Sequence, residues 1–222
     1  KTRSLILNTI SRDKSVEDKK RGFLNPISSR NLDNDVEDEV VKALASSVTS
    51  RFEELSHRYY KIKSSWFKKE KLNWWDRNAP LPNSPIEKWS WKEAKDIVLN
   101  SFEDFSPEIS KIAKVFFDKN WIDAKIRSGK DSGAYSHPTV PSAHPYILMN
   151  YNGKSRDIMT LAHELGHGVH QILSARNGYF LSDTPLTLAE TASVFGEMLV
   201  FQNLLAKTKS KIGKKHLIAG KV

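Results

Sequence analysis

The 222-residue sequence predicts a mainly α-helical protein with one small β-ribbon. Apolar residues recur every three or four positions along most of the chain, which is the period of an amphipathic helix. Glycine and proline gather in a few short stretches that separate these periodic segments. Only the region from 129 to 151 has the turn-rich character of short strands. We therefore expect the ribbon there and helices on both sides of it.

The composition excludes several classes of protein. Hydrophobic residues make up 39% of the chain and charged residues 27%, which is enough apolar matter for a core and too much for a disordered tail. No apolar run reaches about 18 residues, so the sequence predicts no membrane span and no membrane partner. Cysteine is absent, which excludes disulfides, a thiol nucleophile and a thiolate-bound metal. Such a chain suits the reducing cytoplasm, where we expect it, although it is compatible with any compartment.

The first half of the chain carries three helical signals. A long amphipathic helix is expected from roughly Asp35 to Lys63. A loop with three prolines follows from Asn78 to Pro85. Ser90 and Glu93 have the spacing of a capping box at the start of the next helix, and Ser106-Pro107 ends that helix and begins another. The apolar positions of the first helix are Val36, Val40, Leu44, Val48, Phe52, Leu55 and Tyr59.

The second half differs in composition: it begins with a stretch rich in glycine and proline, and strong helical signals follow. This change divides the chain into a helical N-terminal part, residues 1–120, and a C-terminal part, residues 121–222. The elements expected in the second part are strands at Gly133–His137 and Tyr146–Tyr151, a helix from about Ser155 to Ala175, and a helix from Pro185 to about Lys207.

The net charge of +9 is typical of proteins that bind nucleic acid or anionic surfaces. Six lysines and no acid lie between Lys207 and Val222, where a solvated helix face or a frayed tail is the ordinary interpretation. A second cluster, from His57 to Arg77, alternates lysines with aromatic residues. A helical module could hold single-stranded nucleic acid there by stacking, but lysine side chains also commonly cover an apolar helix end. We favour the second interpretation and expect no nucleic-acid partner.

Five of the seven histidines fall between positions 137 and 170, and two of them form the pattern His163-Glu164-Leu165-Gly166-His167. Residues four apart share one face of a helix, so both imidazoles can meet one Zn²⁺. Glu164 lies about 100° further round and can reach a metal-bound water. The alternative is a polar face with solvated histidines. Apolar residues surround the motif on most sides, however, and unpaired buried histidines would be costly.

A catalytic zinc needs a third protein ligand and an open position. His170 lies too far along an unbroken helix to reach the same metal. Glu190 is the better candidate, because it lies 27 residues after His163 on the next helix, which can pack antiparallel. Its alternative role is in a capping box with Thr187. Glu197 lies two turns further along the same face and either orients an imidazole or is a solvated acid.

These motifs resemble oligoendopeptidase F, which belongs to the thimet-oligopeptidase-like zinc metallopeptidases. The likeness is strongest over Thr160–His170 and Pro185–Glu197. It continues upstream through Ser132–Tyr135 and His144–Tyr151, and more weakly to Arg30, so that it covers nearly the whole chain. The resemblance implies a zincin-like, mainly helical metallopeptidase fold with the small β-ribbon before the H-E-x-x-H helix.

The resemblance also implies roles for individual residues. By this resemblance, Glu164 is the general base. The substrates are short peptides, and they would bind by strand addition at Gly133, Ala134 and Tyr135. His144 is a further candidate for substrate contact, although a proline after it fits a plain structural turn equally well. The ligands of the one zinc per chain would be His163, His167 and Glu190.

Members of that family are far longer than this chain. In them, a segment beyond the region that matches Ala219-Gly220 supplies His and Tyr groups for the transition state. We therefore expect these 222 residues to be an internal piece of such a peptidase, with little or no hydrolysis by themselves. The resemblance implies a channel that admits short peptides and excludes folded proteins. The sequence determines neither the peptide preference nor the oligomeric state.

Overall fold

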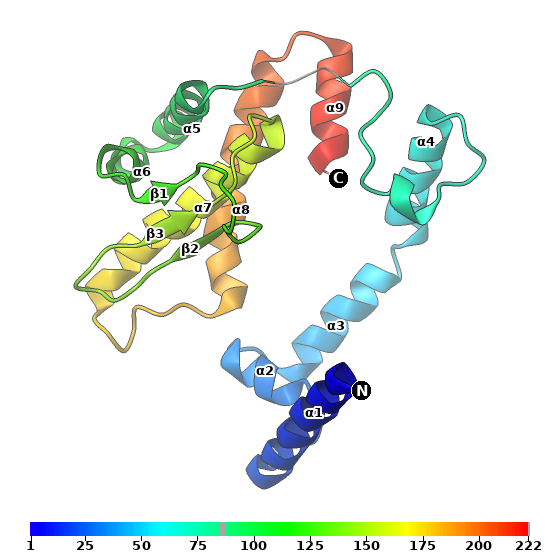
Figure 1. The fold of residues 1–222 in the computed structure, drawn as a ribbon, viewed down its shortest axis with the longest axis vertical. Coiled ribbons are helices and arrows are strands. Elements are labelled where there is room, and N and C mark those ends of the chain that lie inside the picture. The colour runs from blue at the N-terminus through cyan, green and yellow to red at the C-terminus, as the bar shows by residue number, and fades with distance from the viewer. Residues whose placement is uncertain (85–87, 222) are drawn as a thin grey trace. The chain divides into compact units, whose positions relative to one another are not determined.

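The computed structural model describes residues 1–84 and 88–221, and it contains two compact units, residues 1–77 and 78–222. The division proposed from composition lies later, at residue 120, and it stays a prediction. Pro85, the last residue of the expected proline-rich loop, lies outside the described residues, and residues 78–84 contain no helix or strand. The elements of the first unit are α1 (Thr2–Arg21), α2 (Ser28–Asp33), α3 (Asp38–Thr49), a π-helix (Glu53–His57), α4 (Arg58–Trp66) and a 3-10 turn (Trp74–Asp76) (Figure 1).

The single helix expected from about Asp35 to Lys63 is wrong as one continuous element. It is interrupted between Thr49 and Glu53, where short polar side chains compete for backbone carbonyls. The hydroxyl of Thr49 donates to the carbonyl of Ala45 at 2.9 Å. Side-chain bonds of this kind favour a turn over a regular helix. The helical ladder resumes with a wide turn, in which the amide of His57 donates to the carbonyl of Phe52 at 2.8 Å.

The lysine and aromatic cluster from His57 to Arg77 is only partly buried. Lys63 is buried and donates to the carbonyl of Arg77 at 2.6 Å. Burial lowers the pKa of Lys63. Trp74 and Trp75, by contrast, are 76% and 72% exposed. The cluster therefore contains a buried lysine, which ties α4 to the backbone at Arg77, and two exposed tryptophans, which are not core residues.

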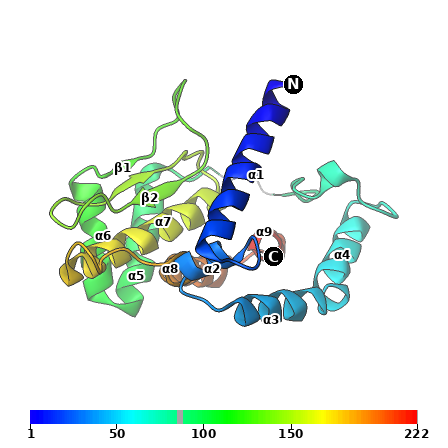
Figure 2. The ribbon, with the colours of Figure 1, turned by 90° about the horizontal axis from the view of Figure 1, so that it is seen from below.

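The second unit packs helices around a small sheet, and one helix lies at its centre. Its elements are α5 (Trp91–Phe105), α6 (Pro107–Asp118), β1 (Ile122–Asp123), β2 (Tyr135–His137), β3 (Tyr146–Leu148), α7 (Ser155–Ser174), a 3-10 turn (Ala175–Asn177), α8 (Leu186–Lys207) and α9 (Lys211–Lys221). Helix α7 contacts strands β2 and β3 and helices α5, α6 and α8 (Figure 2). Half of the 20 residues of α7 are buried, among them Ile158, Leu161 and Leu165.

The sheet has the strand order β1-β3-β2, with β1 parallel and β2 antiparallel to β3. Both expected strands are confirmed, although each is shorter than its predicted range. The sequence did not indicate β1, because a two-residue strand carries no periodic signal and depends on long-range pairing with Ile147 and Leu148. Strand β2 lies at an edge of this sheet, which leaves one side of it unpaired by β3.

The predicted helix boundaries in this unit are confirmed by their caps. The amide of Glu93 donates to the hydroxyl of Ser90 at 3.2 Å, and the amide of Ser90 donates to the Glu93 carboxylate at 2.8 Å. Ser106 caps α6, in which Pro107 is the first residue. The mainly helical fold with a small sheet before α7 is therefore the one that the sequence predicted. Within residues 1–84 and 88–221, no helix is both long enough and apolar enough to cross a bilayer.

Candidate metal centre

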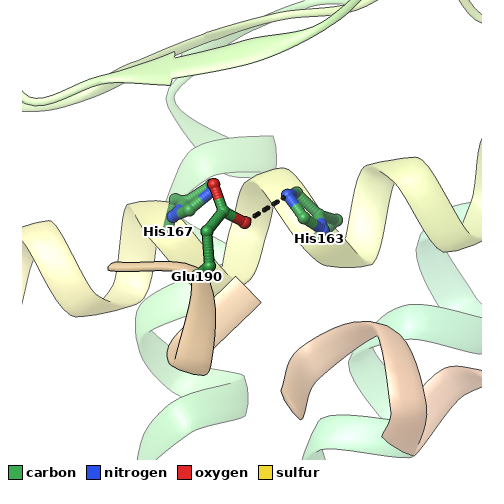
Figure 3. Close-up of side chains that lie close together, drawn as sticks. All are labelled: His163, His167 and Glu190. Atoms are coloured by element: carbon green, nitrogen blue, oxygen red, sulfur yellow. Dashed lines mark ion pairs between the residues drawn. The ribbon is translucent and has the colours of Figure 1, made fainter. Parts of the chain in front are cut away.

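Two histidines of α7 and one glutamate of α8 converge in the second unit. The rings of His163 and His167 lie one turn apart with their centroids separated by 4.9 Å. The Nε2 atom of His163 lies 3.4 Å from Oε2 of Glu190, and the Nε2 atom of His167 lies 3.7 Å from Oε1 of the same carboxylate. Figure 3 shows the carboxylate of Glu190 reaching towards both rings. The three residues predicted as ligands thus form one cluster.

The spacing within this cluster fits a zinc ion. One ligand atom from each of His163, His167 and Glu190 lies within 4.8 Å of the others. Two ligand atoms bound to zinc at about 2.05 Å in tetrahedral geometry lie about 3.3 Å apart. The two nitrogen–oxygen distances of 3.4 and 3.7 Å are close to that value. Two imidazoles and a carboxylate are also the donor set that catalytic zinc sites use, with a fourth position left open.

The distance between α7 and α8 is set by glycines. A Cβ atom added to Gly166 would lie 2.7 Å from the carbonyl oxygen of Ala192 and 2.8 Å from Cα of Ser193. A Cβ atom added to Gly196 would lie 2.9 Å from the carbonyl oxygen of Ala162. The two backbones therefore touch directly, and this contact brings Glu190 to the histidines. Sequence reasoning missed this role, although the glycine within the H-E-x-x-H motif is a visible signal of it.

Hydrogen bonds and ion pairs hold the ligand side chains in place. The hydroxyl of Ser193 donates to Oε2 of Glu190 at 2.9 Å. Oε2 of Glu197 lies 3.4 Å from Nδ1 of His163. Glu190 lies near the other nitrogen of the same ring, Nε2. The other oxygen of Glu197 pairs with Nζ of Lys221 at 2.7 Å. This geometry suits Glu197 to orient the His163 ring. Ser193 and Lys221 were not identified from the sequence.

Burial tunes the titration of the site. Glu164 is only 5% exposed. Burial raises the pKa of Glu164 to about 7, and the negative charge of Glu190 contributes to this shift as a smaller cause. Burial also lowers the pKa of His167, and the neighbouring His163 acts in the same direction, whereas Glu190 opposes both. The lower pKa favours the neutral imidazole, which is the form that binds a metal.

A cleft of about 640 Å³ opens beside this cluster. Gly133 and Ala134, two of the predicted substrate-binding residues, lie in its wall together with His163 and Glu164. Tyr135, the third predicted substrate-binding residue, is half exposed in β2 and lines a different pocket together with Trp121 and Tyr146. The remaining residues of the cleft wall are Met149, Asn150, Arg156, Asp157, Met159, Thr160, Glu197, Gly220 and Lys221.

His144 lies elsewhere, in a different pocket of about 630 Å³. Its ring stacks on Trp121 at 3.8 Å between centroids, with 6° between the ring planes. His170 is not part of the cluster formed by His163, His167 and Glu190. The structure therefore brings together the three predicted ligands with Glu164, Glu197, Gly133 and Ala134, and it separates His144 from them.

Two residues that the sequence did not indicate hold the wall of the cleft. The side chain of Lys130 is only 2% exposed, and its ammonium group donates to the carbonyls of Asp123 at 2.8 Å and Met149 at 2.6 Å. The amide of Asn150 donates to the carbonyls of Asp131 at 2.9 Å and of Gly133 at 3.1 Å. Both contacts join the loop before β2 to the chain beyond β3, and so they fix Gly133 in the wall of the cleft beside His163.

The profile of peptidase family M3 matches residues 2–219 of the chain. The chain belongs to peptidase family M3. Among curated relatives, this M3 chain is 31% identical over 205 residues to an oligoendopeptidase F homolog of Borreliella burgdorferi, covering 91% of the chain and 34% of the relative. It is 29% identical over 180 residues to oligopeptidase PepF of Bacillus subtilis, covering 81% and 26%. The resemblance to oligoendopeptidase F is thereby confirmed.

Solved structures agree with this assignment. A candidate peptidase from Chlamydophila abortus matches 99% of the M3 chain and 37% of its own length, with 27% identity and a TM-score of 0.78. A candidate oligoendopeptidase F from Bacillus anthracis has a TM-score of 0.79 at 20% identity, over 95% of the M3 chain and 40% of that protein, which shows the shared fold. The M3 chain spans about a third of the length of the first of these curated relatives and about a quarter of the second.

Proposed function

We propose that the chain carries the zinc-binding part of an endopeptidase that hydrolyses short peptides. The convergence of His163, His167 and Glu190 at zinc-compatible distances carries this proposal. The buried Glu164 beside that cluster adds a proton acceptor whose pKa is near neutrality. Membership of family M3 supports the same activity, since the relatives named above are peptidases.

The mechanism is hydrolysis by an activated water. Zinc, when bound, supplies a Lewis acid that polarises the scissile carbonyl and lowers the pKa of water. Glu164 takes a proton from the attacking water and returns it to the leaving amine. Glu197 lies 3.4 Å from Nδ1 of His163, where its carboxylate favours a proton on Nδ1 and so leaves Nε2 of that ring for the metal. No covalent intermediate with the protein is expected.

The substrate binds as an added strand beside β2. Strand β2 is at the edge of the sheet, so β3 leaves its outer side open to a peptide, although the Ser136 carbonyl already accepts a hydrogen bond from Gln171 at 3.2 Å. Gly133 and Ala134, immediately before β2, line the cleft with Glu164. An extended peptide at this edge therefore runs past the proton acceptor. This arrangement suits short, unfolded peptides, because a folded protein offers no free strand to add.

Metal analysis of the purified chain tests the zinc site. We expect about one zinc per chain, lost in His163→Ala and in Glu190→Ala, because each variant removes one of three ligands. His57→Ala in the first unit is the matched control and should keep the zinc. An equal zinc content in His163→Ala and the native chain would overturn the ligand assignment.

Glu164→Gln tests the proton transfer. In any polypeptide that contains these residues and cleaves a quenched peptide, this change should abolish hydrolysis and leave the zinc content unchanged. The amide keeps the shape of the carboxyl group but cannot accept the proton. Hydrolysis at the native rate by the zinc-loaded variant would show that Glu164 is not the general base.

A further inference from the structure

The zinc cleft contains an arginine that the proposed mechanism does not use. Arg156 lies in the first turn of α7 and lines the same cleft as His163 and Glu164. It is exposed, and its guanidinium group has no ion-pair partner among residues 1–84 and 88–221. A free guanidinium group presents several donors in a planar fork that matches a carboxylate.

The spacing along α7 places Arg156 in line with the metal ligands. It precedes His163 by seven residues, which is two helical turns, or about 10 Å along the helix axis on the same face. An extended peptide advances about 3.3 Å per residue. About three residues would therefore separate a group bound at the metal from a group bound at Arg156.

The direction of β2 decides which end of a peptide reaches Arg156. Gly133, before the start of β2, lines the same cleft as Thr160 of α7. Further along, Ser136 and Gln171 are joined by hydrogen bonds of 2.8 and 3.2 Å. Strand β2 therefore runs in the same direction as α7. A peptide that pairs antiparallel with β2, as β3 does, runs the opposite way and brings its C-terminal end to Arg156.

We propose that Arg156 binds the C-terminal carboxylate of the peptide, about three residues beyond the scissile bond. This inference rests on the proposed peptidase function and adds a class of substrate, namely peptides that end shortly after the cleaved bond. The charge of Arg156 also selects the direction of binding, because a peptide in the opposite orientation would bring its positive N-terminus to a cation.

The other charged groups of the cleft wall are already engaged. Lys221 pairs with Glu197 at 2.7 Å. One carboxylate oxygen of Asp157 accepts two backbone N–H groups before α7, at 2.8 and 2.9 Å. Asp157 follows Arg156 directly in the chain and is half-buried, whereas Arg156 itself is exposed to water. The preference for a carboxylate is therefore expected to be moderate, about tenfold, rather than the larger factor of a buried pair.

Binding of phosphinic peptides to the zinc-loaded chain tests the proposal. The phosphinate binds the metal and so fixes the register, and the peptides carry two to five residues after it, each as the free acid and as the amide. We expect the acid to bind about tenfold more tightly than the amide, with the largest ratio at about three residues. In Arg156→Gln the ratio should fall below about twofold, and Arg156→Lys should keep part of it. Arg176→Gln, which changes an exposed arginine outside the cleft, should behave as the native chain.

The outcomes separate this inference from the proposed function. If no phosphinic peptide binds, or if binding does not depend on zinc, the peptidase site itself is wrong. If acid and amide bind equally to the native chain, or if Arg156→Gln keeps the ratio, the site stands and the role of Arg156 is wrong. An amidated peptide with glutamate as its last residue is a further arm. Full affinity for that peptide would assign Arg156 to acidic side chains and overturn the terminal-carboxylate assignment.

Discussion

Substitution of Gly166 by alanine should weaken both the fold and the metal site. The new Cβ atom would lie 2.7 Å from the carbonyl oxygen of Ala192, whereas ordinary contact begins at 3.4 Å, so the two backbones must separate locally by about 0.7 Å. Overpacking of this kind costs about 1–3 kcal/mol. Alanine returns at most about 1 kcal/mol through its higher helix propensity. If overpacking costs about 3 kcal/mol, the upper end of its range, the free energy of unfolding should fall by a net amount of about 2 kcal/mol.

Calorimetry of the zinc-free chain measures this loss. For a unit of this size, about 2 kcal/mol corresponds to a fall in Tm of about 4–8 °C. Zinc affinity, measured by competition with a chelator, should also fall by at least about tenfold, because metal–ligand distances tolerate only about 0.2 Å of error. Gly220→Ala is the control, since nothing lies within 4 Å of its added Cβ atom. An unchanged Tm and zinc affinity in Gly166→Ala would refute the claim that backbone contact sets the spacing of α7 and α8.

Two further predictions concern buried charges. Because burial raises the pKa of Glu164 from 4.5 to about 7, its contribution to stability is present below pH 4.5 and is lost as the pH rises to about 7. Glu164→Gln should therefore stabilise the zinc-free chain at pH 8, by at most about 3 kcal/mol in urea unfolding, and an equal or lower stability there would contradict this. Lys130→Met should cost about 1–3 kcal/mol and speed hydrogen exchange over residues 131–134, because it removes the side-chain donor of the buried Met149 carbonyl. Arg127→Met, which breaks an exposed pair with Asp123, is its control, and equal effects of the two variants would count against the anchoring role of Lys130.

The parts of the site that the sequence predicts are those set by helix geometry. His163 and His167 share a face because they are four residues apart, whatever surrounds them. Glu164 follows from the same motif. The prediction of Glu190 as a ligand required a count of ligands and a family resemblance, because no local signal decides between a helix-capping role and a metal-binding role for this residue. The capping residues Ser90 and Ser106 are likewise local signals, and the structure confirms both.

The parts that the sequence did not predict depend on contacts between distant segments. Lys130 reaches the carbonyl of Met149, 19 residues away, and Lys221 pairs with Glu197 across two helices. Neither partner is specified by periodicity or by spacing. The prediction of one continuous helix across Thr49 failed for a different reason. The apolar period continues across it, while hydroxyl groups that bond to nearby carbonyls interrupt the helix locally.

The proposed metal ligands and the proposed peptide-binding edge are held by different contacts, and this separation can be tested. The ligands depend on the crossing of α7 and α8 at Gly166, whereas the edge before β2 depends on Lys130 and Asn150. Gly166→Ala should therefore lower zinc affinity, and peptide binding only as a consequence of metal loss. Lys130→Met should leave zinc affinity within about twofold and weaken phosphinic peptide binding at saturating zinc, since the loop carries no metal ligand. A parallel loss of zinc affinity in both variants would mean that sheet and helices position the metal as one cooperative unit.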